Sequence, residues 1–167
     1  FGDPAEMAAA LCAAADDTGI AMTLLPVFYA HSGFSGLTPR DGQKRFITSV
    51  ETFAELVAAA ERHVSRLDDG VTGIAPHSLR AVTPAELDAL VAMYRNGPIH
   101  IHIAEQVREV EDCVAATGQR PVAWLLGHAD VDARWCLVHA THMDEIETKA
   151  LAASGAVAGL CPITEAD

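Results

Sequence analysis

The stretch that decides the fold is HIHIAEQ, residues 100–106. A short apolar run that follows Gly97–Pro98 and precedes charged residues predicts a buried strand. Two-residue alternation places His100 and His102 on one face of that strand and the isoleucines on the other. A single imidazole in such a strand is more often a hydrogen-bonded core residue than a ligand, so these histidines need support from the rest of the chain.

Composition indicates one globular domain. The chain has 167 residues, of which 50% are hydrophobic, which is enough for a sizeable core. Its four cysteines have no C-x-x-C spacing, which favours free thiols in a cytoplasmic protein over a disulfide framework or a structural zinc site. We expect no signal peptide, and no apolar run reaches the roughly 18–20 residues of a membrane span.

Charge bears on the partners of the protein. The formal net charge is −12 and there is no run of Lys and Arg, which argues against nucleic-acid binding. An anionic small substrate would therefore need a local arginine to hold it.

Helical and strand patterns alternate along the chain. We expect strands at 23–30, 70–79, 99–106, 135–142 and 156–163, and helices at 4–18, 48–69, 84–95, 108–116, 121–128 and 145–154. Ser49 and Thr83 are predicted N-caps, and Gly19 and Gly155 are predicted helix ends.

This alternation predicts an α/β fold with a parallel sheet. Polar segments follow three of the strands, at PHSLR, HIAEQ and HATHMD. In a (β/α)8 barrel the reacting groups lie at that carboxyl end of the strands. A doubly wound sheet would normally show an early glycine-rich phosphate turn, and none is present. We therefore expect a partial (β/α)8 TIM-type barrel.

His102 and Glu105 form an H-x-x-E pair at a strand end. An imidazole there can bind Zn²⁺, and a carboxylate beside a metal-bound water can carry its proton to a leaving group. The pair is weak evidence alone, but His139 stands at the equivalent end of the next strand and could contact the same water.

Other candidates line the same rim. Arg80 could hold a carboxylate, with His77 beside it, although Arg80 could equally be a surface charge paired with an acidic residue. His100 is predicted inside the barrel, with a His100–His102 ligand pair as the alternative. Tyr29 and His31 belong to a loop that could line the pocket, and His142 to a loop or helix cap.

Several stretches resemble the formimidoylglutamate deiminases of the amidohydrolase superfamily: FYAHSGFSG, GQKRFI, PHSLRAVTP, HIHIAEQVREVEDC, RPVAWLL, DARWCLVHATHMD and ALAASGAVAGLCPITEA. The resemblance implies a (β/α)8 barrel with one zinc ion that hydrolyses N-formimidoyl-L-glutamate to N-formyl-L-glutamate and ammonia. It matches His102 to a metal ligand, Glu105 to the proton-shuttling acid and His139 to the catalytic histidine. It matches His77 and Arg80 to substrate contacts.

The chain also departs from that pattern. The H-x-H pair of strand one and the aspartate of strand eight have no counterpart here, and a whole barrel takes roughly 250 residues. We therefore interpret residues 1–167 as a single segment covering about strands 3–7, without strands 1, 2 and 8. The resemblance further implies a dicarboxylate substrate and a possible homodimer, and the charge and the short apolar runs predict no nucleic-acid or membrane partner. Two alternatives stay open: a purine or pterin deaminase of the same superfamily, and a non-catalytic fragment.

Overall fold

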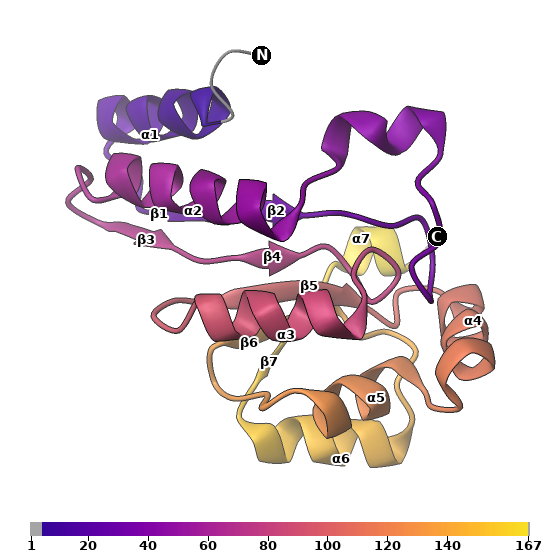
Figure 1. Ribbon diagram of the computed structural model, residues 1–167. Coiled ribbons are helices and arrows are strands. Elements are labelled where there is room, and N and C mark those ends of the chain that lie inside the picture. The colour runs from indigo at the N-terminus through magenta and orange to yellow at the C-terminus, as the bar shows by residue number, and fades with distance from the viewer. Residues whose placement is uncertain (1–4, 167) are drawn as a thin grey trace.

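Strands and helices alternate along the computed structural model, which describes residues 5–166 (Figure 1). The strands are β1 (Met22–Leu24), β2 (Val27–Phe28), β3 (Gly70–Thr72), β4 (Ala75–Pro76), β5 (Ile99–Ile103), β6 (Trp135–His139) and β7 (Val157–Gly159). The helices are α1 (Glu6–Thr18), α2 (Val50–Val64), α3 (Pro84–Met93), α4 (Val107–Thr117), α5 (Pro121–His128), α6 (Glu145–Ser154), α7 (Pro162–Glu165) and the 3-10 helix η1 (Asp41–Phe46).

Every strand pair in this part of the chain is parallel. β1 pairs with β3, β2 with β4, and β5, β6 and β7 form one sheet in that order. Isolated bridges from Ile74 to Ile99 and from Ser78 to His102 connect the β3–β4 segment to β5. If β1–β2 and β3–β4 are each counted as one interrupted strand, strands that are neighbours in space are also neighbours in sequence. This is the strand order of a (β/α) barrel. The expected fold, a partial TIM-type barrel segment, is confirmed.

The first two expected strands are each broken. Pro26 separates β1 from β2, and proline has no N–H to donate to a ladder. Gly73 separates β3 from β4, and a Cβ at this position would lie 2.4 Å from the Pro98 carbonyl oxygen. The backbones therefore approach so closely that only glycine fits, and the expectation of continuous strands at 23–30 and 70–79 was wrong.

The core lies between the sheet and the outer helices. Ile99, Ile101 and Ile103 of β5 are at most 1% exposed, whereas the histidines between them are partly exposed on the other face. The isoleucines join a buried cluster with Leu87 of α3 and Leu125 of α5. Alternation along β5 thus separates a packed face from a face that carries imidazoles, as the sequence predicts.

The predicted helix ends are largely confirmed. The side-chain oxygens of Ser49 and Thr83 accept hydrogen bonds from the backbone N–H groups of Thr52 and Glu86. Gly19 and Gly155 end their helices with left-handed φ angles of +68° and +80°. The expected helix 48–69 is shorter than predicted, since α2 ends at Val64, and the predicted first helical residue at position 4 lies outside the described residues.

The expected strand 156–163 was wrong in its second half. β7 ends at Gly159, and α7 begins at Pro162, whose fixed φ and missing N–H suit the first turn of a helix. Glu165 Oε1 accepts a hydrogen bond of 2.6 Å from the Cys161 backbone N–H, which closes the single turn of α7. The 3-10 helix η1 was also not predicted, because its sequence lacks an apolar periodicity.

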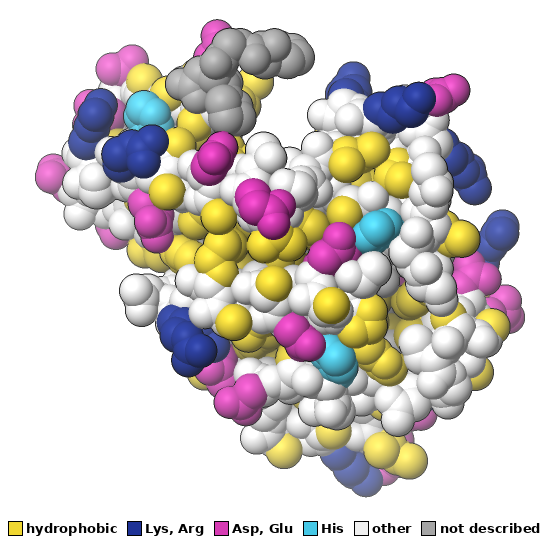
Figure 2. Space-filling model, in the orientation of Figure 1, with side chains coloured by type: hydrophobic (Ala, Val, Ile, Leu, Met, Phe, Trp, Pro, Cys, Tyr) yellow, Lys and Arg dark blue, Asp and Glu magenta, His cyan; other side chains and the backbone are white. Residues whose placement is uncertain are grey.

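Apolar side chains are exposed where the strand layer ends. β1 and β2 pair on one side only, as does β7, and the exposed residues include Val27, Val71, Val157 and Leu160. Charged side chains are dispersed: Figure 2 shows Lys and Arg around the margin of the displayed face, with Asp and Glu among them. Among residues 5–166, no helix is both long and apolar enough to cross a membrane.

Candidate active site at the carboxyl ends of the strands

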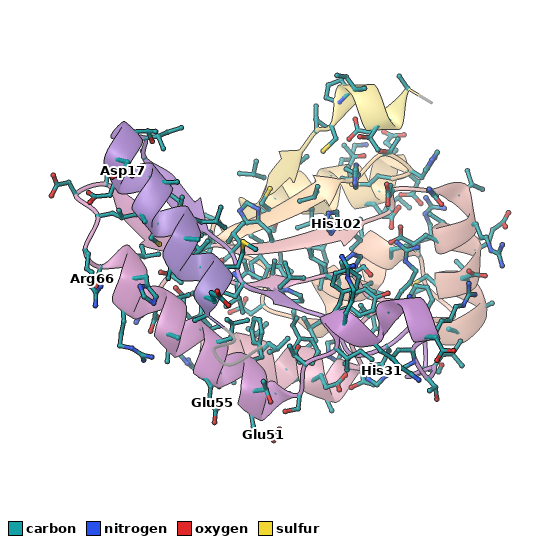
Figure 3. The ribbon with its side chains drawn as sticks, turned by 90° about the horizontal axis from the view of Figure 1, so that it is seen from above. Asp17, His31, Glu51, Glu55, Arg66 and His102 are labelled. Carbon is teal, nitrogen blue, oxygen red and sulfur yellow. The ribbon has the colours of Figure 1, made fainter. Side chains whose placement is uncertain are left out.

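The predicted site residues converge at one end of the strand layer. Figure 3 shows His102 towards the end of the molecule that also carries His31, with Asp17 and Arg66 at the opposite end. The His102 ring centroid lies 4.9 Å from that of His77 and 5.6 Å from that of His139. The carboxyl ends of parallel strands lie at the same end of the sheet. This is why His77 and His139, which are 25 and 37 residues from His102 in sequence, meet it there.

His102 is oriented by the neighbouring strand. Its backbone N–H donates to the His77 carbonyl oxygen at 3.0 Å, and its Nδ1 lies 2.8 Å from the same oxygen. Because a carbonyl oxygen only accepts, Nδ1 carries the proton and Nε2 has a free lone pair. No group of the described structure forms a hydrogen bond with Nε2, so this atom can serve as a metal ligand.

Glu105 and His139 face each other beside His102. Glu105 Oε1 lies 3.5 Å from His139 Nε2, and the His139 side chain is only 7% exposed. The backbone around them is strained, since Ala104, His139 and Ala140 have φ angles of +51°, +72° and +52°. Left-handed backbone at non-glycine residues costs about 1–3 kcal/mol each and concentrates at functional sites.

His77 borders a second part of the site. Its ring packs edge-on against Tyr29, with 4.8 Å between centroids, and both residues line a cavity of about 390 Å³ with Gln43 and Phe46. Burial, with the nearby His102 and Arg80, lowers the pKa of His77 to about 4, against the opposing effect of Glu105. His77 is therefore a neutral imidazole at physiological pH.

Arg80 lies between acidic groups. Its Nη2 is 4.0 Å from Glu105 Oε2 and 3.9 Å from Glu109 Oε2, and one third of its side chain is exposed. Its Nε is buried and has no hydrogen-bond partner in the described structure. Arg80 also lines a larger cavity of about 580 Å³ that extends along α4 and does not include the histidines. The guanidinium thus has donors that protein groups do not satisfy.

Glu109 supports this region and was not singled out from the sequence. Its side chain is fully buried in the first turn of α4 and accepts hydrogen bonds from the backbone N–H groups of Ala104 (3.0 Å) and Glu105 (3.1 Å). Burial raises its pKa, while Arg80 and these hydrogen bonds oppose that shift. An acidic residue in a first helical turn is a common pattern, so the sequence offered no specific signal for this position.

The remaining candidates divide by location. His100 is partly exposed on the same strand face as His102, and burial, with His102 nearby, lowers its pKa. His31 contacts Glu86 at 2.9 Å, which ties it to the start of α3 rather than to the row of imidazoles. His142 lies in the turn after β6, as expected. Glu165, which the sequence analysis did not select, places Oε1 3.4 Å from His139 Nδ1.

Comparison with known proteins agrees with this geometry. Residues 3–166 match the Amidohydrolase family, so the chain belongs to that family. It is similar to the formimidoylglutamate deiminase of Pseudomonas aeruginosa, with 48% identity over 168 aligned residues that cover 100% of this chain and 37% of that enzyme. The chain thus spans little more than a third of the length of this curated relative.

Solved structures show the same arrangement. The crystal structure of an amidohydrolase from Brucella melitensis superposes with a TM-score of 0.96 and 55% identity, over 99% of this chain and 37% of that one. An adenosine deaminase from Xanthomonas campestris with bound zinc superposes with a TM-score of 0.64 and 25% identity, over 89% of this chain and 32% of that one. In both cases this chain covers about a third of the longer protein.

Proposed function

We propose that the complete protein containing this chain hydrolyses N-formimidoyl-L-glutamate to N-formyl-L-glutamate and ammonia. The observation that carries this proposal is the meeting of His102, Glu105 and His139 at the carboxyl ends of neighbouring strands. The chain is also similar over its whole length to a formimidoylglutamate deiminase. In this reaction water adds to the amidine carbon and a C–N bond breaks as ammonia leaves.

A divalent metal fits the donor set, and we propose zinc. His102 Nε2 is the ligand that this chain supplies, because Nδ1 is engaged by the His77 carbonyl oxygen. Further ligands would come from other parts of the complete protein. When bound, the ion lowers the pKa of a water molecule and so makes a nucleophile available near neutral pH. Imidazole ligands also suit iron and other divalent ions, so elemental analysis of the complete protein tests the choice of metal.

His139 and Glu105 have separate tasks. His139 Nε2 can hold the attacking water by a hydrogen bond, which orients it towards the substrate carbon. Glu105 Oε1, 3.5 Å from His139 Nε2, can accept the proton of that water and deliver it to the departing nitrogen. The hydrogen bonds of Glu109 to the backbone of Ala104 and Glu105 fix the turn from which the Glu105 side chain projects.

Substrate recognition is assigned to His77 and Arg80. The unsatisfied guanidinium donors of Arg80 suit a carboxylate, and a chain with a net charge of −12 needs such a cation to hold a dicarboxylate. His77, neutral and adjacent, can donate or accept a hydrogen bond without adding charge. A cytoplasmic location, expected from the spacing of the cysteines, and a homodimer, implied by the resemblance, stay predictions.

A purine or pterin deaminase is the second candidate. The cavity beside His77 is lined by Tyr29 and Phe46, whose rings could stack on a heterocycle, and the adenosine deaminase superposition is consistent with this class. The test measures ammonia release by the complete protein from formimidoylglutamate, formimidoylglycine and adenine. We expect formimidoylglutamate to have the highest kcat/KM, and a preference for either other compound would overturn the proposal.

A further inference from the structure

Three donor groups of different chemistry converge on the side of His139 that faces away from Glu105. A ring nitrogen of His139, Cys161 Sγ and a Glu165 carboxylate oxygen all lie within 4.8 Å of one another, and His139 Nδ1 is 3.4 Å from Glu165 Oε1. His139 ends β6, and the other two residues belong to α7 and the residue before it, the yellow helix of Figure 1. None of these contacts involves His102, so the cluster is separate from the metal ligand proposed above.

The imidazole in this cluster is buried and lacks a hydrogen bond at Nδ1. His139 is 6% exposed, and Nδ1 has no hydrogen-bond partner in the described structure. Glu165 Oε1 is 3.4 Å away but is not in hydrogen-bonding geometry. A buried polar atom without a partner costs about 1–3 kcal/mol, so such atoms commonly have a bound ion, a water molecule or a functional role.

The other two donors are held in place by local structure. Glu165 Oε1 accepts the Cys161 backbone N–H at 2.6 Å, which closes the four-residue turn between them. Pro162 restricts the backbone within that turn. Cys161 Sγ is partly buried, and its contact to the Gly159 carbonyl oxygen is long, at 3.7 Å. The thiol and the second carboxylate oxygen are therefore free to bind a ligand with little rearrangement.

We propose that His139 Nδ1, Cys161 Sγ and the Glu165 carboxylate form a second metal site for a borderline transition-metal ion such as zinc or cobalt. Imidazole, thiolate and carboxylate are the three donor types that zinc prefers, and three protein ligands leave one position for water. A thiolate donor disfavours magnesium and calcium, which bind oxygen. No other grouping of three such donors occurs within residues 5–166.

Occupation of this site would set which nitrogen of His139 carries the proton. A metal on Nδ1 leaves the proton of the neutral imidazole on Nε2, so Nε2 could then only donate a hydrogen bond to the attacking water. The consequence for turnover rests on the proposed function, whereas metal binding by the cluster does not.

The experiment adds Co²⁺ to the complete protein carrying one equivalent of zinc per chain and follows the near-ultraviolet charge-transfer absorption that reports a thiolate bound to cobalt. Metal content after gel filtration gives the stoichiometry. The variants are Cys161→Ser, Glu165→Gln and the matched control Cys136→Ser, which changes a cysteine of similar exposure on β6 that lies near Cys161 but is not one of the three donors. Circular dichroism verifies that each variant is folded.

We expect one extra equivalent of cobalt with a thiolate band in the parent protein and in Cys136→Ser. Cys161→Ser should lose the band and keep its basal activity, and Glu165→Gln should weaken cobalt binding by about tenfold or more. Absence of the band in the parent, its survival in Cys161→Ser, or its loss only in Cys136→Ser would overturn the proposal. Because the band does not depend on turnover, failure of the assigned reaction would leave this result interpretable.

Discussion

Individual residues at the strand ends owe their chemistry to backbone groups of neighbouring strands. His102 has one ring nitrogen held by the His77 carbonyl oxygen, and Glu105 projects from a turn whose N–H groups are bound by Glu109. Such contacts fix which atoms face the reacting centre before a substrate arrives. This preorganisation is the property that mutation of single residues tests.

Replacing Glu105 with Gln in the complete protein should lower kcat by about 10²-fold or more, because the amide cannot take up and release a proton. Metal content should not change, since Glu105 is not assigned as a ligand. Steady-state ammonia release and elemental analysis measure the two quantities. Glu145→Gln, at an exposed position of α6, is the control. Unchanged turnover would remove Glu105 from the mechanism.

Replacing Arg80 with Met keeps much of the side-chain bulk and removes the guanidinium. A buried charge-assisted contact to a substrate carboxylate accounts for about 2–5 kcal/mol, so kcat/KM for formimidoylglutamate should fall by roughly 30-fold or more. Metal content should again be unchanged. A decrease below about threefold would place Arg80 among exposed ion pairs, which contribute only about 0–1 kcal/mol.

At the scale of helices, the start of α3 links the site loop to the scaffold. Thr83 and Glu86 form a capping box, and the Glu86 carboxylate also contacts His31. Burial acts to raise the pKa of Glu86, but hydrogen bonds from the Thr83 backbone and side chain, together with His31, outweigh it and hold this pKa below its usual range. The helix cap and the loop of His31 are therefore stabilised by one ionised carboxylate.

Glu86→Ala should lower the free energy of unfolding at pH 7 by about 1 kcal/mol, the usual effect of losing a cap. A carboxyl group whose pKa is lower in the folded state stabilises the fold above its ordinary pKa, and this contribution disappears as the pH falls through the folded-state value. The difference between parent and variant should therefore shrink as the pH falls below about 4.5. Urea unfolding at several pH values measures it, with Glu55→Ala on the exposed face of α2 as the control (Figure 3). A difference that stays constant with pH would contradict the assignment.

For the whole molecule, the strand layer determines behaviour in solution. β7 and the β1–β2 segment each lack a partner on one side, and apolar residues such as Leu160 (68% exposed) and Ile163 (88% exposed) lie near that boundary. Unpaired strand edges promote association, and closed barrels remove them.

Residues 1–167 expressed alone should therefore release no ammonia from formimidoylglutamate, hold no zinc at the catalytic position beyond what the His139–Cys161–Glu165 cluster binds, and aggregate or associate. The catalytic zinc site needs about three protein ligands besides water, and His102 is the one of these that we assign to residues 1–167. Light scattering, elemental analysis and the ammonia assay test these three expectations. A soluble monomer with enzymatic turnover would show that the metal site is assigned wrongly and that His100 and His102 together bind the catalytic metal. An inactive complete protein would instead favour a non-catalytic role.

The sequence by itself determined the alternation of helices and strands and the helix caps at Ser49 and Thr83. It also determined the end of the sheet, at the carboxyl ends of the strands, where His102, Glu105 and His139 meet. The alternation and the caps depend on periodicity and on contacts within a few residues. The meeting of the three side chains follows because parallel strands place their carboxyl ends at the same end of the sheet. Only the tertiary structure decided that Gly73 must break a strand against Pro98 and that Cys161 and Glu165 lie beside His139. Each of these depends on how closely separate segments approach once the core has packed, a distance that no local pattern specifies.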